Sequence, residues 1–209
     1  MYSRIAGTGS YLPEKVLSNA DLEQTLDTSD EWIRTRTGIE RRHIAAPGET
    51  TVDLAEHAAR RAVEAAGVDP AEVDFIAFGT TTPDLVFPNC GVLLPARLGA
   101  RGCPAFSIET ACSGFIYALS IADKFIRAGE VKCALVVGAE TLSRITDRSD
   151  RSTAILFGDG AGAVVLRPSA EAGVLSTHLH ADGEYRDLLY SRGGVSRGFL
   201  DPETGEADI

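Results

Sequence analysis

One cysteine of the sequence lies where a thiol can act as a nucleophile. Cys112 falls between a β-type run at residues 106–108 and a helical run from Ser113 that has no charged residue before Asp123. A thiol at a helix N-terminus lies beside unpaired N–H groups and the positive end of the helix dipole, and both favour the thiolate. The same N–H groups can bind the oxyanion of a thioester under attack. The pattern predicts a nucleophile on a helix whose first turns are surrounded by protein.

The other three cysteines, Cys90, Cys103 and Cys133, are expected to be small buried hydrophobic residues. The sequence has no C-x-x-C pair and no histidine at metal-ligand spacing, so we expect neither a disulfide framework nor a metal site. This cysteine usage predicts a reduced, cytoplasmic protein.

A helix N-terminus alone is not expected to activate the thiol of Cys112 sufficiently. A helix N-terminus stabilises an anion by only about 0.3–2 kcal/mol, so a base or a second positive group is expected nearby. The four histidines are poorly placed for this role: His57 lies on the polar face of its helix, His43 in a polar run, and His178 and His180 on one side of a predicted strand. We therefore expect the base to lie outside residues 1–209.

A second candidate site combines an aromatic ring with a cation. Trp32 and Arg36 stand four residues apart on a predicted helix and therefore share a face. Without other information this is equally well a surface cation–π pair or part of a binding surface. The glycine-rich run 158–162 lacks the Gly-Lys-Ser/Thr of a phosphate-binding loop and precedes a strand, so we interpret it as a structural turn.

The elements that must position these residues alternate along the chain. Helices are predicted at 28–38, 51–66, 88–98, 113–128 and 151–157, and strands at 5–9, 73–78, 105–108, 133–137, 161–166 and 173–180, the last two as a pair. Ser29 is the expected N-cap of the first helix, which Gly38 ends. This alternation predicts an α/β layered domain with a mostly parallel sheet.

Composition narrows the possible partners. The 209 residues are 44% hydrophobic and 24% charged, which suffices for a real core. A net charge of -10 argues against a general nucleic-acid binder, and an acidic protein partner would need a local basic patch. No run approaches the roughly 18 apolar residues of a membrane span, and no signal peptide is recognisable, so no membrane association is expected. Residues 191–209 are predicted to form an acidic, glycine-rich loop, so we expect the chain to stop inside a larger fold.

Four sequence blocks resemble one enzyme family. The run 108–115, Ile-Glu-Thr-Ala-Cys-Ser-Gly-Phe, resembles the nucleophile segment of the thiolase-fold condensing enzymes. The blocks at 30–39, 158–163 and 176–183 narrow the likeness to the β-ketoacyl-[acyl-carrier-protein] synthase III family, and it extends from near residue 1 to about residue 190. The resemblance implies a thiolase-like layered fold. Residues 1–170 would form its first half, and 171–209 the truncated start of the second half or an insertion.

The resemblance also implies a reaction. Cys112 would take an acetyl group from acetyl-CoA and condense it with malonyl-acyl-carrier protein to a 3-oxoacyl-carrier protein, which initiates fatty-acid synthesis. The enzyme would be a homodimer without a cofactor, because acetyl-CoA is a substrate. The family's catalytic His and Asn and a second oxyanion N–H come from the second half of the fold, so residues 1–209 alone are not expected to catalyse the condensation.

Further site residues follow from the resemblance alone. Trp32 and Arg151 match the residues that sandwich the adenine of CoA, with Thr28 and Arg36 beside them. Phe87 matches a residue that reaches across the dimer to limit the acyl pocket. The lining of that pocket would be Leu142, Leu156, Phe157 and Leu189, although each would serve equally well in a plain core.

Three other functions compete with this interpretation. A related condensing enzyme of secondary metabolism would use a different starter in a different acyl pocket. A non-catalytic half-domain interaction module would not need Cys112, Trp32 and Arg151 together. A cysteine hydrolase would need a base and a water path, and the sequence shows neither.

Overall fold

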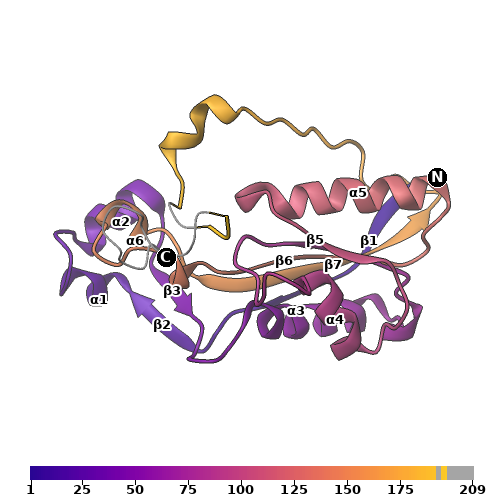
Figure 1. The fold of residues 1–209 in the computed structure, drawn as a ribbon, viewed down its shortest axis with the longest axis horizontal. Helices are drawn as coiled ribbons and strands as arrows, with labels where there is room; N and C mark the ends of the chain where they lie inside the picture. Colours follow the sequence, from indigo (N-terminus) through magenta and orange to yellow (C-terminus); the bar gives the residue numbers. More distant parts are fainter. Residues whose placement is uncertain (192–193, 197–209) are drawn as a thin grey trace.

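The protein is built on a five-stranded sheet between two layers of helices (Figure 1). The computed structural model describes residues 1–191 and 194–196. The strands are β1 (Tyr2–Tyr11), β4 (Phe75–Gly79), β5 (Ala105–Ile108), β6 (Ala134–Thr141) and β7 (Asp159–Ser169), and the long helices are α3 (Thr51–Ala66), α4 (Cys90–Leu98) and α5 (Gly114–Ala128). Figure 1 shows α3 and α4 on one face of the sheet and α5 on the other. This is the α/β layered fold that the sequence predicts.

The sheet has strand order β1-β7-β6-β4-β5. Strand β4 pairs in parallel with β5 and β6, whereas β7 is antiparallel to both β6 and β1. Four strands therefore run in one direction and only β7 runs against them, which confirms the mostly parallel sheet. Ligand sites in such sheets lie outside the carboxyl ends of the parallel strands. That edge is where Cys112 should be found.

A smaller group of elements lies at one end of the sheet, on the left in Figure 1. It consists of the two-stranded ribbon β2 (Lys15–Ser18) and β3 (Arg41–Ile44) with the short helices α1 (Asn19–Glu23), α2 (Asp30–Thr37) and α6 (Arg151–Ala154). We call these elements the small lobe. Leu22, Ile33 and Ile155 form its own core, with Trp32 packed against it. The ribbon and α1 were not predicted from the sequence.

Local sequence signals explain the helices. The Ser29 hydroxyl accepts a hydrogen bond from the backbone N–H of Trp32 at 3.1 Å, and Gly38 ends α2 with a φ of 73°. Thr50 and Asp53 form a capping box at the start of α3, which spans the predicted residues. The other short helical turns are Pro70–Glu72, Ala111–Ser113, Leu142–Arg144 and Gly183–Leu188.

Two hydrophobic cores hold the layers together. Small residues of α3 pack on the sheet, and the backbone of α3 approaches β1 so closely that an added Cβ at Gly9 would lie 2.2 Å from the carbonyl oxygen of Ala58. On the other face, α5 packs through residues such as Ala118 and Ile126. Each face of the sheet is therefore buried by helices.

A buried carboxylate joins β1 to α5. Asp123 is 1% exposed and accepts hydrogen bonds from Ser3 at 2.5 Å, Lys124 at 2.9 Å and Arg127 at 2.9 Å. Burial alone would raise the pKa of Asp123, but these three donors outweigh it and hold the pKa below its usual range.

The predicted strand at 173–180 is wrong. This segment is irregular and follows the outer side of α5, where Thr177 hydrogen-bonds Ser120 at 2.8 Å and the carbonyl of His180 accepts from Tyr117 at 3.3 Å (Figure 1). It cannot pair with β7 because β7 already has β1 and β6 on its two sides. Most of the predicted loop at 191–209 lies outside the described residues.

Candidate active site

A cavity of about 690 Å³ opens at the carboxyl edge of the parallel strands. Gly79 at the end of β4 and Gly138 in β6 line it, together with Ala111, Cys112 and Phe115 from the start of α5. The predicted nucleophile is therefore at the edge where the fold favours a ligand site. Its side chain is exposed, whereas the sequence indicated a helix start surrounded by protein.

The backbone around Cys112 forms a tight turn. Residues Ala111–Ser113 make a single 3₁₀ turn before α5, and Ala111 has a φ of 43°, in the left-handed region. Non-glycine residues held there cost about 1–3 kcal/mol and cluster at active sites. The N–H groups of Ser113 and Gly114 donate to Thr110 and Ala111 within this turn. The turn therefore uses two of the N–H groups that the sequence assigned to an oxyanion.

Backbone contact fixes the start of α5 on the sheet. An added Cβ at Gly79 would lie 2.6 Å from the carbonyl carbon of Gly114 and 2.8 Å from the nitrogen of Phe115. An added Cβ at Gly138 would lie 3.2 Å from the Cβ of Phe115. Gly79 at the end of β4 and Gly138 within β6 thus let the turn that carries Cys112 lie directly on the sheet.

The other three cysteines are held as thiols. Burial raises the pKa of Cys90 and of Cys133 to about 11, and it also raises the pKa of Cys103. Cys90 and Cys133 are fully buried and Cys103 is half-buried, as expected of small hydrophobic residues. Among the four, only Cys112 is both exposed and beside the cavity.

A partly buried carboxylate in the cavity wall was missed by sequence reasoning. Glu140 is the second-last residue of β6 and accepts hydrogen bonds from the backbone N–H groups of Thr81 at 2.8 Å and Thr82 at 3.1 Å, and from the hydroxyl of Thr80 at 3.2 Å. Burial raises the pKa of Glu140, although these hydrogen bonds oppose the rise. A charged residue at the carboxyl end of an apolar strand was the signal that could have found it.

No histidine lines the cavity in the described part of the chain. His57 stacks on Tyr11 with ring centroids 4.5 Å apart, and Nδ1 of His43 lies 2.6 Å from the carbonyl oxygen of Pro13. The nearest partner of the His178 ring is Ser176, at 3.1 Å. The described residues therefore place no imidazole in the wall of the cavity beside Cys112.

The predicted nucleotide-binding residues come together in the small lobe. The guanidinium carbon of Arg36 lies 4.7 Å, and that of Arg151 4.9 Å, from the ring centroid of Trp32. Arg151 also donates to the carbonyl of Asp27 at 2.8 Å, next to Thr28, whose hydroxyl is buried without a hydrogen-bond partner among the described residues. Two helices distant in sequence thus bring an aromatic ring, two cations and a free hydroxyl together.

The predicted acyl-pocket residues separate into two groups. Leu142, Phe157 and Leu189 line the cavity beside Cys112. Leu156 is 40% exposed and does not line it, and Phe87 is 83% exposed outside it. The cavity beside the thiol is therefore largely apolar on the side formed by the first three residues.

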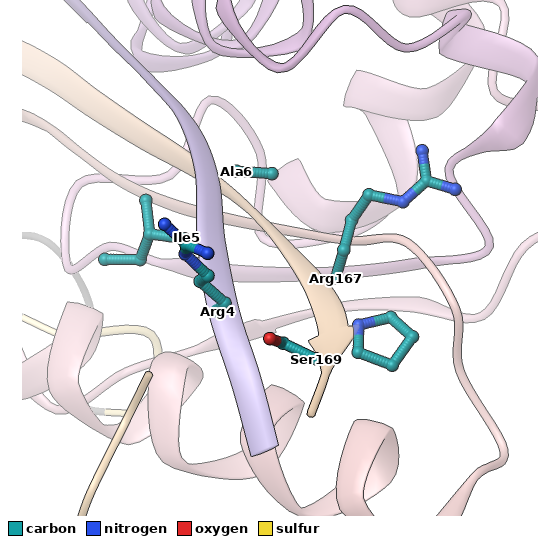
Figure 2. A pocket seen from close by; sticks show the side chains of 6 residues that line it. Arg4, Ile5, Ala6, Arg167 and Ser169 are labelled. Atoms are coloured by element: carbon teal, nitrogen blue, oxygen red, sulfur yellow. The ribbon is translucent and has the colours of Figure 1, made fainter. Parts of the chain in front are cut away.

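A second, smaller cavity of about 350 Å³ lies between β1 and β7, at the opposite edge of the sheet (Figure 2). Its two arginines are already paired, Arg4 with Glu171 at 2.6 Å and Arg167 with Glu72 at 3.5 Å. Within the described ranges no group of three His, Cys, Asp or Glu side chains is placed to hold a metal ion. The cavity at Cys112 is therefore the candidate site.

Comparison with known proteins gives a consistent result. Residues 106–183 match the family model described as 3-oxoacyl-[acyl-carrier-protein (ACP)] synthase III. The β-ketoacyl-[acyl-carrier-protein] synthase III of Xanthomonas campestris pv. campestris is 62% identical over 205 residues, which cover 98% of this chain and 63% of the relative. The chain thus spans less than two thirds of the length of this relative.

Solved structures agree. The 3-oxoacyl-(acyl carrier protein) synthase III of Pseudomonas aeruginosa superimposes with a TM-score of 0.87 at 44% identity, over 95% of this chain and 62% of that one. A priming β-ketosynthase of a polyketide biosynthetic pathway superimposes with a TM-score of 0.78, also at 44% identity, over 80% of this chain and 50% of that one. With a thiolase-like fold, a thiol at the carboxyl edge of its sheet and these relatives, the chain is similar over nearly its whole length to part of the β-ketoacyl-[acyl-carrier-protein] synthase III enzymes.

Proposed function

We propose that this chain carries the nucleophile of an acyltransferase that condenses acetyl-CoA with malonyl-acyl-carrier protein. The observation that carries the proposal is the position of Cys112, which is exposed beside a cavity of about 690 Å³ while the other cysteines are buried or half-buried. The 62% identity with a curated synthase III supports the same reaction. The product, a 3-oxoacyl-carrier protein, initiates fatty-acid synthesis.

The reaction has two stages at Cys112. The thiolate attacks the carbonyl carbon of acetyl-CoA, and the tetrahedral intermediate expels CoA as its thiolate, which takes up a proton, leaving an acetyl thioester on Cys112. Malonyl-carrier protein then loses CO₂, and the electron pair of the broken bond attacks the acetyl carbonyl. The new C–C bond forms as the Cys112 thiolate leaves. The backbone N–H of Cys112 is the proposed oxyanion donor, because Ser113 and Gly114 already donate within the turn.

The small lobe supplies the proposed CoA site. The adenine stacks on Trp32 opposite Arg151, and Arg36 and Thr28 bind the adjoining phosphates and ribose. The acyl chain occupies the cavity against Leu142, Phe157 and Leu189. The enzyme needs no cofactor of its own, since acetyl-CoA is a substrate.

The assembly is proposed to be a cytoplasmic homodimer. Strand β5 lies at the edge of the sheet, and Leu85, Val86 and Phe87 are exposed by 50%, 59% and 83%. Apolar side chains that project from a surface favour protein contact, and Phe87 would then enter the partner's acyl pocket. No helix among the described residues is long and apolar enough to cross a membrane. Residues 1–170 would form the first half of the thiolase fold and 171–209 the start of the second.

Mass spectrometry tests the nucleophile directly. After incubation with acetyl-CoA, the intact mass should rise by one acetyl group, and peptide mapping should place that group on Cys112. Cys103→Ser should acylate like the unchanged protein, because Cys103 is the other cysteine that is not fully buried. Cys112→Ser should abolish the label. An acetyl group on Cys90, Cys103 or Cys133 with Cys112 unmodified would refute the proposal.

A second candidate is a condensing enzyme with another starter, as the polyketide priming β-ketosynthase among the relatives indicates. Its chemistry at Cys112 would be the same and its acyl pocket different. Competition among acyl-CoAs of increasing chain length separates the two: a preference for acetyl-CoA supports the first function, and a preference for a longer or branched starter supports the second.

A further inference from the structure

The proposed adenine site depends on two segments that are distant in sequence. Trp32 and Arg36 belong to α2, whereas Arg151 begins α6. The distance of 4.9 Å between the Arg151 guanidinium and the Trp32 ring holds only while α2 and α6 keep their relative positions. Something between these two short helices must therefore fix their spacing.

Arg42 lies between them and is almost completely buried. It belongs to β3 and is 3% exposed. Its Nε donates to the carbonyl oxygen of Ile155 at 2.9 Å, and its Nη2 donates to the same oxygen. Ile155 is the C-cap residue of α6, so the guanidinium binds the end of the helix that Arg151 begins.

This arginine has no ion-pair partner among the described residues. Burial lowers the pKa of Arg42, which reflects the cost of placing its charge in the lobe interior. An added Cβ at Gly158 would lie 3.0 Å from the Cβ of Arg42, so the surrounding backbone is packed closely. Burying a cation without an ion-pair partner costs more free energy than filling the core with an apolar side chain. We therefore infer that the role of Arg42 lies in the fixed geometry of its hydrogen bonds.

Asn19 completes the connection to α2. It is 1% exposed, and its Oδ1 accepts from Nη1 of Arg42 at 2.5 Å. Its Nδ2 donates to the carboxylate of Asp30 at 2.7 Å and to the carbonyl of Ile39 at 2.9 Å. Asp30 is the first residue of α2 and Ile39 follows its end. A single buried network thus joins the C-cap of α6 to both ends of α2.

We propose that Arg42 and Asn19 are positioning residues that set the spacing between Trp32 and Arg151 and thereby the affinity for the nucleotide part of CoA. This inference rests on the proposed function of the small lobe. Neither side chain touches the thiol cavity or the proposed adenine site, so both act through the two helices. Their loss should affect ligands that carry the nucleotide and spare those that lack it.

The test compares two ligands on matched variants of the 209-residue chain. Trp32 is its one tryptophan, so tryptophan fluorescence reports CoA binding at this site alone. Arg42→Met removes all three hydrogen bonds, and Arg42→Lys keeps the charge without the planar fork that reaches both acceptors. Both should weaken CoA binding about tenfold, corresponding to about 1.4 kcal/mol. Acylation of Cys112 by S-acetyl-N-acetylcysteamine, which has no nucleotide, should change less than about twofold.

The control is Ser3→Ala. Ser3 is as buried as Arg42 and donates to the buried Asp123 at 2.5 Å, but it lies at the opposite edge of the sheet. This variant should lose stability without changing CoA affinity. If Arg42→Met does not fold, Asn19→Asp carries the test, because it keeps the acceptor for Arg42, removes the donors to Asp30 and Ile39, and places a second carboxylate beside Asp30.

The measurements distinguish failure of the positioning role of Arg42 and Asn19 from failure of the proposed adenine site. If Trp32→Ala binds CoA as well as the unchanged chain, measured by calorimetry, the adenine site itself is wrong. If Trp32→Ala weakens CoA and the folded Arg42 variants do not, the positioning role alone is refuted. Equal losses of CoA binding and of acylation by S-acetyl-N-acetylcysteamine would also refute it, because they would mean that the network only stabilises the fold.

Discussion

Gly79→Ala is expected to disable Cys112 without touching it. A Cβ at this position would lie 2.6 Å from the carbonyl carbon of Gly114. Non-bonded carbons are in optimal contact at roughly 3.5–4.0 Å, so the end of β4 and the start of α5 must separate by about 1 Å. The carbonyl carbon of Gly114 and the nitrogen of Phe115, which lies 2.8 Å from this Cβ, both belong to the backbone, so no side-chain rotation can relieve the contact.

Two magnitudes follow from this displacement. Overpacking of this kind costs about 1–3 kcal/mol of stability. A misplacement of about 1 Å in reacting groups can cost roughly 10²-fold in rate, and the turn that carries Cys112 moves with α5. We therefore expect acetylation by acetyl-CoA to slow by about two orders of magnitude under conditions where the variant is fully folded.

Two other glycines of the same sheet provide the controls. Gly162 in β7 has no atom within 4 Å of an added Cβ, so Gly162→Ala should be neutral or slightly stabilising. Gly9→Ala places a Cβ 2.2 Å from the carbonyl oxygen of Ala58 in α3, on the face of the sheet away from Cys112. It should destabilise the fold and leave acetylation of the folded protein unchanged.

The assay is a time course of acetylation by intact mass, with urea unfolding of each variant alongside it. Alkylation of Cys112 by iodoacetamide gives a second rate that does not depend on the proposed substrate. Acetylation of Gly79→Ala at the rate of Gly162→Ala would refute the expected displacement of Cys112. The displacement is also refuted if Gly9→Ala slows acetylation as much as Gly79→Ala, because general destabilisation would then explain both.

Trp32→Ala and Arg151→Ala should each weaken CoA thioesters at least about tenfold, since base stacking is worth about 1–3 kcal/mol, and should spare a nucleotide-free acetyl thioester in competition assays. Burial raises the pKa of Asp123, but its three hydrogen-bond donors lower the pKa by more than burial raises it. The stabilising contribution of the ionised Asp123 is therefore complete above roughly pH 3.9 and is lost as the pH falls through the depressed pKa. Asp123→Asn should therefore reduce the loss of stability below about pH 4, and parallel urea-midpoint profiles would contradict this. Phe87→Asp should convert the proposed dimer to monomer in sedimentation velocity, and an unchanged dimer would place the interface elsewhere.

Local signals predicted much of the fold. The α3 helix spans the predicted residues because an amphipathic pattern, a capping Thr50 and a terminal Gly67 all agree. The position of Cys112 at a strand-to-helix turn was also predicted, because the apolar strand and the uncharged helix on its two sides are local patterns. The cation–π contact of Trp32 with Arg36 followed from helical spacing alone.

Pairing over long distances was the part that local patterns could not supply. Residues 173–180 have the composition of a strand, but strand formation requires a free neighbour, and β7 is already paired on both sides. The approach of Arg151 to Trp32 depended on the family resemblance, since 118 residues separate them in the chain. The Arg42–Asn19 network left no sequence signal, because a buried arginine bound to a carbonyl looks like any other arginine of a polar run.

The proposed nucleophile and the proposed nucleotide site are held by different means, and Asp159 connects the two parts of the protein. Cys112 is placed by backbone contact between α5 and the strand ends, whereas Trp32 and Arg151 are placed by buried side chains of the small lobe. Asp159 begins β7 and is 4% exposed. Its carboxylate accepts a hydrogen bond at 2.7 Å from the backbone N–H of Ala45, which follows β3. It accepts a second one at 2.8 Å from the backbone N–H of Ser143, in the turn that begins at Leu142 of the cavity wall. One carboxylate thus connects the small lobe to the wall of the thiol cavity. Because the proposed CoA thioester would have to reach from the proposed adenine site to the thiol, the distance between the two parts matters as much as the geometry within each.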